Sequence, residues 1–222
     1  HCISSAASDV YKRQPLTLIK APLEEIAESE TLSENGTNNI HTSLRNVNAL
    51  LRLTTNLINF ERADSFSNEL YVSEYELGSY LSDTVNAFRP YAGVKRINLT
   101  FECNFRYLTI WLDKDKMDSI LKNIISNALK YTPENGNVHV YASETEDSWS
   151  VEVKDTGIGI PAAEQKKLFR IHFRGSNAVN SKVTGSGIGL LLVWKLVHMH
   201  KGKINFSSTE GKGSCIRVTF PK

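Results

Sequence analysis

The chain has 222 residues, 41% hydrophobic and 23% charged, and this composition excludes an intrinsically disordered or a fibrous protein. At roughly 100–200 residues per domain, the length allows one large domain or a small domain joined to a medium one. Lys and Arg number 26 against 24 Asp and Glu, a balance that predicts no nucleic-acid partner.

The cysteines and the apolar runs indicate a soluble chain from a reducing compartment. Cys2, Cys103 and Cys215 lie far apart and outside any C-x-x-C spacing, so we expect free thiols. The longest apolar run, residues 188–194, is far shorter than the roughly 18–20 residues that cross a bilayer.

Residues 16 to about 64 predict a helical hairpin. Leu16, Ile19, Leu23 and Ile26 have helical spacing, and a polar break is expected at residues 34–37. A coiled-coil seam follows at Ile40, Leu44, Val47, Leu51, Thr54 and Ile58, and a second apolar stripe at Leu50, Leu53, Leu57 and Phe60. Two stripes on one helix favour a four-helix bundle completed by a second copy of the chain. The alternative is that both stripes pack on the rest of the same chain.

From about Ser65 the pattern becomes mixed α and β. We expect helices at residues 76–88, ended by Pro90, and over about 18 residues after an N-cap at Asp113, ended before Pro133. Strands are expected at residues 97–103, 138–142, 149–153, 204–207 and 216–220, the last two joined through Gly211 and Gly213. The order predicts one mixed sheet with helices on one face.

The first segment that carries chemistry is residues 123–132 (NIISNALKYT), late on the helix after Asp113. Asn123 and Asn127 share a helix face with Lys130 or Tyr131. Neutral amide oxygens suit a hard cation such as Mg²⁺, and lysine suits a phosphate. The simpler reading is a helix surface that happens to carry two asparagines.

The second segment, residues 155–161 (DTGIGIP), directly follows a predicted strand. The Asp155 carboxylate can accept a hydrogen bond from an exocyclic amine, and Gly157 and Gly159 let backbone approach a flat ligand. The alternative is an ordinary glycine turn that leads to a helix with proline near its start.

The third segment, residues 185–190 (GSGIGL), precedes an apolar helix. Glycines at a helix start expose backbone N–H groups and the positive end of the helix dipole, which together bind phosphate. Leu190 stands where a Rossmann fingerprint needs glycine, and the chain has no P-loop, so a bound nucleotide requires another fold.

These three segments, with residues 169–174 (FRIHFR) between the last two, resemble in this order the ATP-binding domain of sensor histidine kinases. Residues 15–66 resemble the dimerisation and phosphotransfer hairpin of that family, and residues 67–222 its catalytic domain. The spacing is most similar to hybrid sensor kinases of Bacteroidetes. The resemblance implies an α+β architecture: a hairpin that dimerises as a four-helix bundle, then a Bergerat-type α/β sandwich that binds ATP beneath a lid, residues 170–186.

The resemblance also implies site residues. Asn127 would hold Mg²⁺, Asn123 and Lys130 would contact phosphates, and Asp155 would accept from the adenine amine. The full set of implied cofactor contacts is Asn123, Asn127, Lys130, Tyr131, Asp155, Gly157, Gly159, Ile160, Phe169, Phe173, Thr184, Gly185, Ser186, Gly187, Gly189 and Leu190.

One departure affects the phosphoacceptor. Of the family pattern S-H-E-L-R-T-P-L, Arg13, Pro15 and Leu16 are present, but Val10 stands at the histidine position and Tyr11 at the acidic one. Valine has no nucleophilic atom, so we expect no autophosphorylation at the usual position. Residues 1–14 lack helical apolar periodicity and are interpreted as an anomalous leader, either a cloning or sequencing scar or a natural degenerate kinase.

Three functions are therefore weighed. A GHKL ATPase would need a Glu general base at position 123, where an asparagine cannot take a proton. A nucleotide-binding dimeric scaffold agrees with Val10. The favoured hypothesis is the cytoplasmic kinase core of a membrane-anchored sensor, anchored by segments outside this chain, which binds Mg-ATP and passes phosphate to histidine and then to a response-regulator receiver domain.

Overall fold

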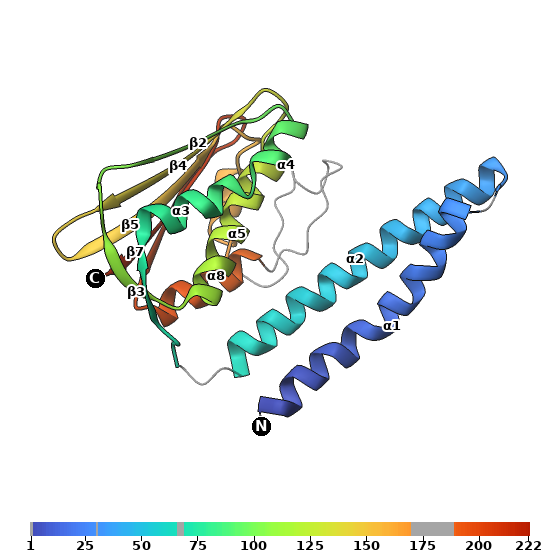
Figure 1. The fold of residues 1–222 in the computed structure, drawn as a ribbon. Coiled ribbons are helices and arrows are strands. Elements are labelled where there is room, and N and C mark those ends of the chain that lie inside the picture. Colours follow the sequence, from blue (N-terminus) through green and yellow to red (C-terminus); the bar gives the residue numbers. More distant parts are fainter. Residues whose placement is uncertain (1, 30, 66–68, 170–188) are drawn as a thin grey trace. The chain divides into compact units, whose positions relative to one another are not determined.

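The computed structural model describes the backbone of residues 2–29, 31–65, 69–169 and 189–222, and the side chains of residues 16–29, 31–48, 50, 51, 54, 69–169 and 189–222. The chain divides into two compact units, His1–Ser65 and Phe66–Lys222 (Figure 1). Among the described residues, no helix is long and apolar enough to cross a membrane.

The first unit is a hairpin of two helices that run side by side, α1 (Cys2–Ser29) and α2 (Glu34–Ser65) (Figure 1). The hairpin prediction is confirmed, but the expected helix start at Leu16 is wrong, because α1 begins at Cys2. Residues 2–14 are helical although their apolar residues have no helical period, since the backbone can continue a helix without an amphipathic face.

The turn of the hairpin lies before residues 34–37, not at them as expected. Ser33 caps α2: its Oγ accepts from Gly36 N at 3.2 Å, and its carbonyl oxygen accepts from Thr37 N at 2.9 Å. A serine before Glu34 is a helix start signal, and it outweighs the weak helix propensity of Asn35 and Gly36.

The hairpin buries few of its described side chains. Val47 is 7% exposed, whereas Leu18, Ile19 and Leu50 are 66%, 49% and 49% exposed. A single hairpin therefore leaves apolar surface in water on both helices.

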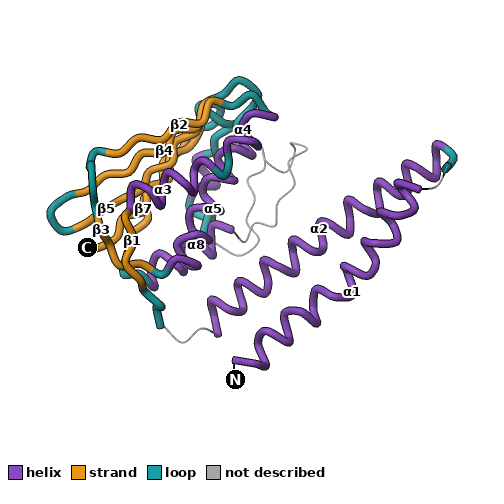
Figure 2. The backbone as a smooth tube through the Cα atoms, in the orientation of Figure 1, coloured by secondary structure: helices purple, strands orange, loops and turns teal. Residues whose placement is uncertain are grey.

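The second unit is built around a five-stranded sheet, order β2-β4-β5-β7-β6. Its strands are β2 (Asn98–Cys103), β4 (Asn137–Glu144), β5 (Ser148–Asp155), β6 (Lys203–Thr209) and β7 (Gly213–Pro221). The β2–β4 pair is parallel and the other three pairs are antiparallel. Helices α3 (Leu77–Asn86), α5 (Lys114–Tyr131) and α8 (Gly189–Met199) cover one face (Figures 1 and 2), which confirms the predicted α/β sandwich with a mixed sheet.

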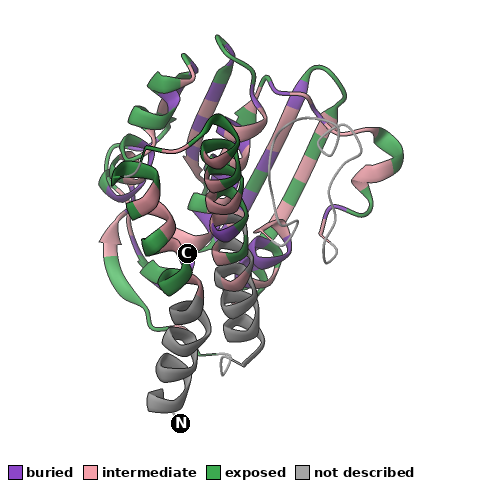
Figure 3. Cartoon of the chain, turned by 90° about the vertical axis from the view of Figure 1, so that its right-hand side faces the viewer, coloured by how far each residue is buried: buried purple, intermediate pink, exposed green. Residues whose placement is uncertain are grey.

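The core lies between this sheet and the helices (Figure 3). Val138, Val140 and Ala142 alternate along β4 and are each 0% exposed, as period-two patterning requires. From the helix side, Ile120, Leu121 and Leu129 of α5 are also fully buried. The apolar face of α5 is thus fixed against the sheet, and its asparagines necessarily face elsewhere.

Two local predictions for this unit need correction. The helix expected over residues 76–88 is α3 alone, and Pro90 lies in the first turn of a separate helix, α4 (Arg89–Val94), where its missing N–H costs nothing. A two-stranded sheet of β1 (Ser73–Glu76) and β3 (Thr109–Leu112) had no sequence prediction, and the short helix α6 (Ala162–Gln165), with Pro161 as its N-cap, was expected only in the alternative reading of residues 155–161. Elements of four residues are too short to establish a period.

Candidate nucleotide-binding site

Helix α5 presents the two asparagines. Its N-cap is Asp113, whose side chain accepts from Lys116 N at 3.1 Å, and it ends at Tyr131, before Pro133. Both boundaries agree with the prediction. Asn123 and Asn127 are half-buried on the face turned away from the core residues.

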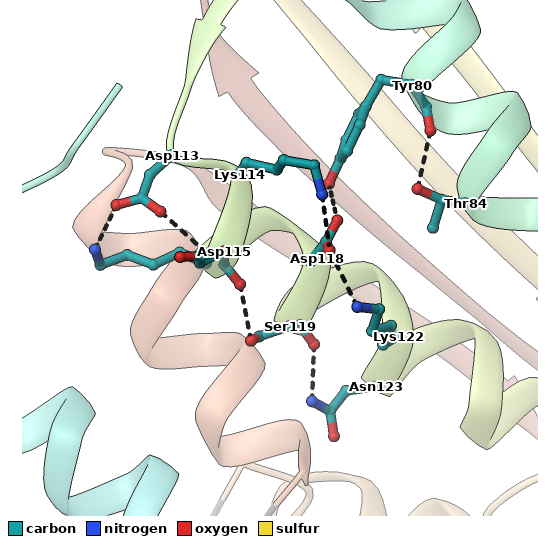
Figure 4. A network of polar contacts seen from close by, with 10 residues as sticks. Tyr80, Thr84, Asp113, Lys114, Asp115, Asp118, Ser119, Lys122 and Asn123 are labelled. Carbon is teal, nitrogen blue, oxygen red and sulfur yellow. Dashed lines mark hydrogen bonds and ion pairs between the residues drawn. The ribbon is translucent and has the colours of Figure 1, made fainter. Parts of the chain in front are cut away.

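A polar network anchors the first half of α5 to α3 (Figure 4). The Tyr80 hydroxyl donates to Asp118 Oδ1 at 2.7 Å, and Lys114 and Lys122 contact Asp118 Oδ2 at 3.2 and 3.0 Å. Burial and the Asp118 carboxylate raise the pKa of Tyr80, so it remains a hydroxyl donor at any working pH. The network fixes the helix that carries the asparagines.

The orientation of the Asn123 amide is set by its own helix. Its Nδ2 donates to the Ser119 carbonyl oxygen at 2.8 Å, and its Oδ1 points away from that bond (Figure 4). A Cβ placed on Gly189 would lie 2.6 Å from this oxygen, so any other residue at the start of α8 would displace the Asn123 amide. The first and third sequence segments therefore meet at Asn123 and Gly189.

The Asp155 carboxylate is held at the end of β5. Its Oδ1 accepts from Gly157 N at 2.8 Å and from Ser214 N at 3.2 Å. Burial raises the pKa of Asp155, and these two N–H groups act in the opposite direction. Within the described part of the chain both bonds fall on Oδ1, which leaves Oδ2 to accept from a ligand.

The turn after Asp155 presses against the end of α5. A Cβ on Gly157 would lie 2.6 Å from the Tyr131 carbonyl oxygen, and Ile158 N donates to that oxygen at 3.2 Å. Gly159 has φ +63°, and a side chain there would collide with the Thr209 carbonyl oxygen. Both glycines are required by close backbone packing within the protein.

The residues that hydrogen-bond this turn and hold it in place were not predicted from the sequence. Ser208 Oγ accepts from Ile160 N at 2.9 Å, and Gln165 Nε2 donates to the carbonyl oxygens of Ile160 and Ser208, each at 2.9 Å. Gly211 N donates to the Ile158 carbonyl oxygen at 2.8 Å. The one signal was the glycine pair of the β6–β7 hairpin, interpreted only as a tight connection.

Lys130 and Tyr131 lie together at the end of α5. The Lys130 ammonium is 4.8 Å from the centre of the Tyr131 ring and 3.3 Å from its hydroxyl oxygen. Ile160 and Phe169 are half-buried around α6, and Leu190 is half-buried in the first turn of α8. The structure thus brings the Asp155 turn to Tyr131, and Gly189 to Asn123, on a single helix.

The remaining predicted residues lie outside the described ones. These are Phe173, Thr184, Gly185, Ser186 and Gly187. Val10 and Tyr11 lie in the described backbone of α1, but their side chains are outside the description.

Chemically, the described groups suit a purine nucleotide. Asp155 Oδ2 is an acceptor for an amine, the amide oxygens of Asn123 and Asn127 are neutral ligands, and Lys130 supplies a cation. Since α8 begins beside Asn123, the positive end of its dipole lies at the same place.

Comparison with known proteins agrees with this geometry. Residues 112–222, half of the chain, match the family described as histidine kinase-, DNA gyrase B-, and HSP90-like ATPase. Histidine kinase P4 of Formosa agariphila is 29% identical over 94% of this chain and 16% of its own length, which fits the expected likeness to Bacteroidetes kinases.

Sensor histidine kinase WalK of Bacillus subtilis is 32% identical over 94% of this chain and 34% of its own length. The chain therefore spans about a third of one of these relatives and a sixth of the other. The crystal structure of full-length ShkA in complex with AMPPNP has a TM-score of 0.79 and 22% identity over 98% of this chain and 45% of its own, a likeness of fold.

Proposed function

Given that this chain belongs to the histidine kinase-, DNA gyrase B- and HSP90-like ATPases and carries a sensor histidine kinase core, we propose that it binds Mg-ATP at α5 for phosphoryl transfer to a protein side chain. The observation that carries the proposal is the convergence on α5: the Asp155 turn is bonded to Tyr131, and α8 begins against Asn123. Micromolar-range affinity for ADP or ATP is expected.

Each described group has a role in this proposal. Asp155 Oδ2 accepts from the adenine amine, with Gly157 and Gly159 beneath the base and Ile160 and Tyr131 lining it. Asn123 and Lys130 contact the phosphates, and Gly189 and Leu190 lie at the positive end of α8. The further lid and phosphate contacts, Phe169, Phe173, Thr184, Gly185, Ser186 and Gly187, are assigned from the resemblance alone.

Mg²⁺ is proposed at Asn127. Within the described part of the chain, the Asn127 side chain has no hydrogen-bond partner, and the bond from the Asn123 nitrogen to Ser119 directs the Asn123 oxygen toward the start of α8. Half-buried amide oxygens on one helix face fit a hard cation that keeps water and phosphate among its ligands. When bound, the ion neutralises charge on the phosphates during transfer.

The nature of Asn123 favours transfer to a side chain over hydrolysis. A water-activating base would lie one helical turn before Asn127, and the Asn123 amide, with Nδ2 donating to a carbonyl oxygen, cannot accept a proton. Phosphoryl transfer depends mainly on positioning and charge neutralisation, which amides, lysine and backbone N–H groups supply.

The hairpin is proposed to dimerise. Leu18, Ile19 and Leu50 are 66%, 49% and 49% exposed within one chain, and a four-helix bundle of two chains would cover such surfaces. In this proposal residues 15–66 form the dimerisation and phosphotransfer hairpin and residues 67–222 the catalytic domain.

The whole protein is proposed to be a membrane-anchored sensor with a cytoplasmic kinase core. Its phosphoryl group would pass from ATP to a histidine and then to an aspartate of a response-regulator receiver domain. This rests on the sensor histidine kinase relatives, which are several times longer than this chain.

One observation favours a second function, a nucleotide-binding dimeric scaffold. Val10 occupies the acceptor position and Tyr11 the acidic one. Without a nucleophile at position 10, bound ATP has no acceptor at the usual place.

Incubation with γ-labelled ATP separates the two functions. The chain is compared with Val10→His/Tyr11→Glu, and with the same double variant carrying Asn127→Ala as a control. Label that appears only in Val10→His/Tyr11→Glu and is lost in acid supports a competent kinase domain behind an altered acceptor. Label in none of the three would contradict it and favour the scaffold.

A further inference from the structure

The carboxyl end of α5 is closed by a lysine from another element. The last four carbonyl groups of a helix have no partner within it. Lys95 Nζ donates to the carbonyl oxygens of Leu129 at 2.7 Å, Lys130 at 3.2 Å and Thr132 at 2.8 Å. One ammonium group therefore satisfies three carbonyls at the negative end of the helix dipole.

The path of the chain delivers Lys95 to this point. Lys95 follows α4 as its C-cap, and the next residue, Arg96, has φ +53°, a left-handed conformation that is unfavourable for a side chain with a Cβ. Burial lowers the pKa of Lys95, and Glu134 acts in the opposite direction. Burying the Lys95 ammonium and holding Arg96 in a left-handed conformation both cost folding free energy. The three hydrogen bonds of Lys95 Nζ act against this cost.

The Tyr131 carbonyl, which lies between those of Lys130 and Thr132 along the chain, belongs to the proposed nucleotide site. The Tyr131 oxygen accepts from Ile158 N at 3.2 Å. A Cβ on residue 157 would lie 2.6 Å from the same oxygen, so the close approach requires glycine there. Lys95 thus holds the backbone on both sides of Tyr131, the point where the turn that carries Asp155 meets α5.

We propose that Lys95 is a positioning residue of the nucleotide site, a built-in cation that aligns Tyr131, Lys130 and the Asp155 turn. This rests on the proposed function, because it concerns the same site. Convergent backbone carbonyl oxygens can also coordinate a monovalent cation such as potassium. Removal of the lysine side chain should therefore leave a site that ammonium or potassium can fill.

The test is chemical rescue. ADP affinity of Lys95→Ala is measured by calorimetry at constant ionic strength in tetramethylammonium, ammonium or potassium chloride. The matched control is Lys203→Ala, an exposed lysine on β6. In tetramethylammonium, Lys95→Ala should bind ADP about tenfold more weakly than the unchanged chain, since small misplacements of binding groups are costly. Ammonium or potassium should restore most of the lost ADP affinity of Lys95→Ala. The ADP affinities of the unchanged chain and of Lys203→Ala should be the same in all three salts.

Two results would overturn the proposal: ADP affinity of Lys95→Ala within twofold of the unchanged chain, or a weakened affinity that neither small cation improves. A purely structural role predicts the second result. If Lys95→Ala does not fold, Lys95→Gln takes its place. Because its side-chain amide is neutral, this variant should bind ADP more weakly than the unchanged chain. Equal affinity of the two would contradict a need for the cation.

A separate readout distinguishes this proposal from the proposed function. Hydrogen exchange of the Ile158 amide, measured without nucleotide, should be faster in Lys95→Ala and slow again in ammonium. If the unchanged chain does not bind ADP, the proposed function fails, yet this exchange still tests the role of Lys95 in holding Ile158 to Tyr131. Unchanged exchange would refute that role.

Discussion

Ile158 donates its backbone N–H to the carbonyl oxygen of Tyr131 at 3.2 Å, so the turn after Asp155 is bonded to the last residue of the asparagine helix. The adenine-reading carboxylate and the phosphate-facing amides proposed above therefore depend on one rigid helix. Changes at this junction should affect nucleotide binding more than changes at exposed turns.

Gly157→Ala tests the junction directly. Its Cβ would lie 2.6 Å from the Tyr131 oxygen and 2.7 Å from Asp155 Oδ1, so backbone must move. We expect a loss of roughly 1–3 kcal/mol in the free energy of unfolding, as for other overpacked sites, together with weaker ADP binding. Thermal denaturation and calorimetry measure both. Gly93→Ala is the control, since no atom lies within 4 Å of its Cβ, and an equal effect of the two substitutions would argue against the junction.

Asp155→Asn should change which base is preferred. The amide oxygen can still accept from Gly157 N and Ser214 N, while the other position becomes a donor facing the ligand. ADP should bind at least about tenfold more weakly to the variant. The affinity for inosine diphosphate, which offers an acceptor at that position, should fall much less. Equal losses for the two nucleotides would remove Asp155 from base recognition.

The same variant carries a stability prediction. Burial raises the pKa of Asp155 above its unfolded value, so the folded state binds the proton more tightly and the ionised carboxylate costs stability at neutral pH. This cost is absent below the unfolded pKa and grows as pH rises to the folded one. Nucleotide-free Asp155→Asn should therefore unfold at the same or a higher temperature at pH 7, and a clearly lower temperature would contradict the assigned environment.

Gly189→Ala should act through Asn123. The new Cβ would lie 2.6 Å from Asn123 Oδ1, and because that is the end of a side chain, the amide can turn away without unfolding the domain. Nucleotide affinity should fall in Gly189→Ala and in Asn123→Ala, but the double variant should lose little more than Asn123→Ala alone. Additive losses would show that the two positions act independently.

Glu76 gives a pH dependence in acid. Hydrogen bonds from Ser79, Gly78 and Leu108 lower the pKa of Glu76 to about 2, against burial, which acts in the opposite direction. The contribution of its carboxylate is present above the unfolded pKa and is lost as pH falls through the folded one. Relative to Glu76→Gln, the free energy of unfolding of the unchanged chain should fall by about 1 kcal/mol between pH 4.5 and about 2. Solvent screening keeps this value small. Urea denaturation at several pH values measures it; a constant difference would contradict the cap.

The sequence was sufficient where signals are local. Asp113 and Pro133 delimit α5, and alternating apolar residues define β4 and β5, so the fold class and the asparagine face could be predicted. The polar break was predicted at residues 34–37, which already lie in α2, because the weak helix formers Asn35 and Gly36 are a more visible signal than one capping serine before them. Local patterns resolve boundaries only when the caps are recognised.

The rest of the site depends on contacts between distant segments. Ser214 meets Asp155 across 59 residues, Ser208 meets Ile160 across 48, and Lys95 meets Thr132 across 37. A serine beside a glycine hairpin or a lysine before a strand has no distinguishing pattern in one sequence. The register of β5, β6 and β7 brings the two serines to the Asp155 turn, whereas Lys95 reaches the end of α5 from the C-cap of α4.

The central claim is a magnesium-dependent nucleotide site on α5. Its most direct test is calorimetric titration of ADP into the unchanged chain and Asn127→Ala, each with Mg²⁺ and with a chelator, and with Ser126→Ala as the control on the same helix. The unchanged chain and Ser126→Ala should bind ADP more tightly with Mg²⁺, and Asn127→Ala should lose that gain while it keeps its affinity without the ion. Equal Mg-nucleotide affinity for Asn127→Ala and the unchanged chain would contradict the account.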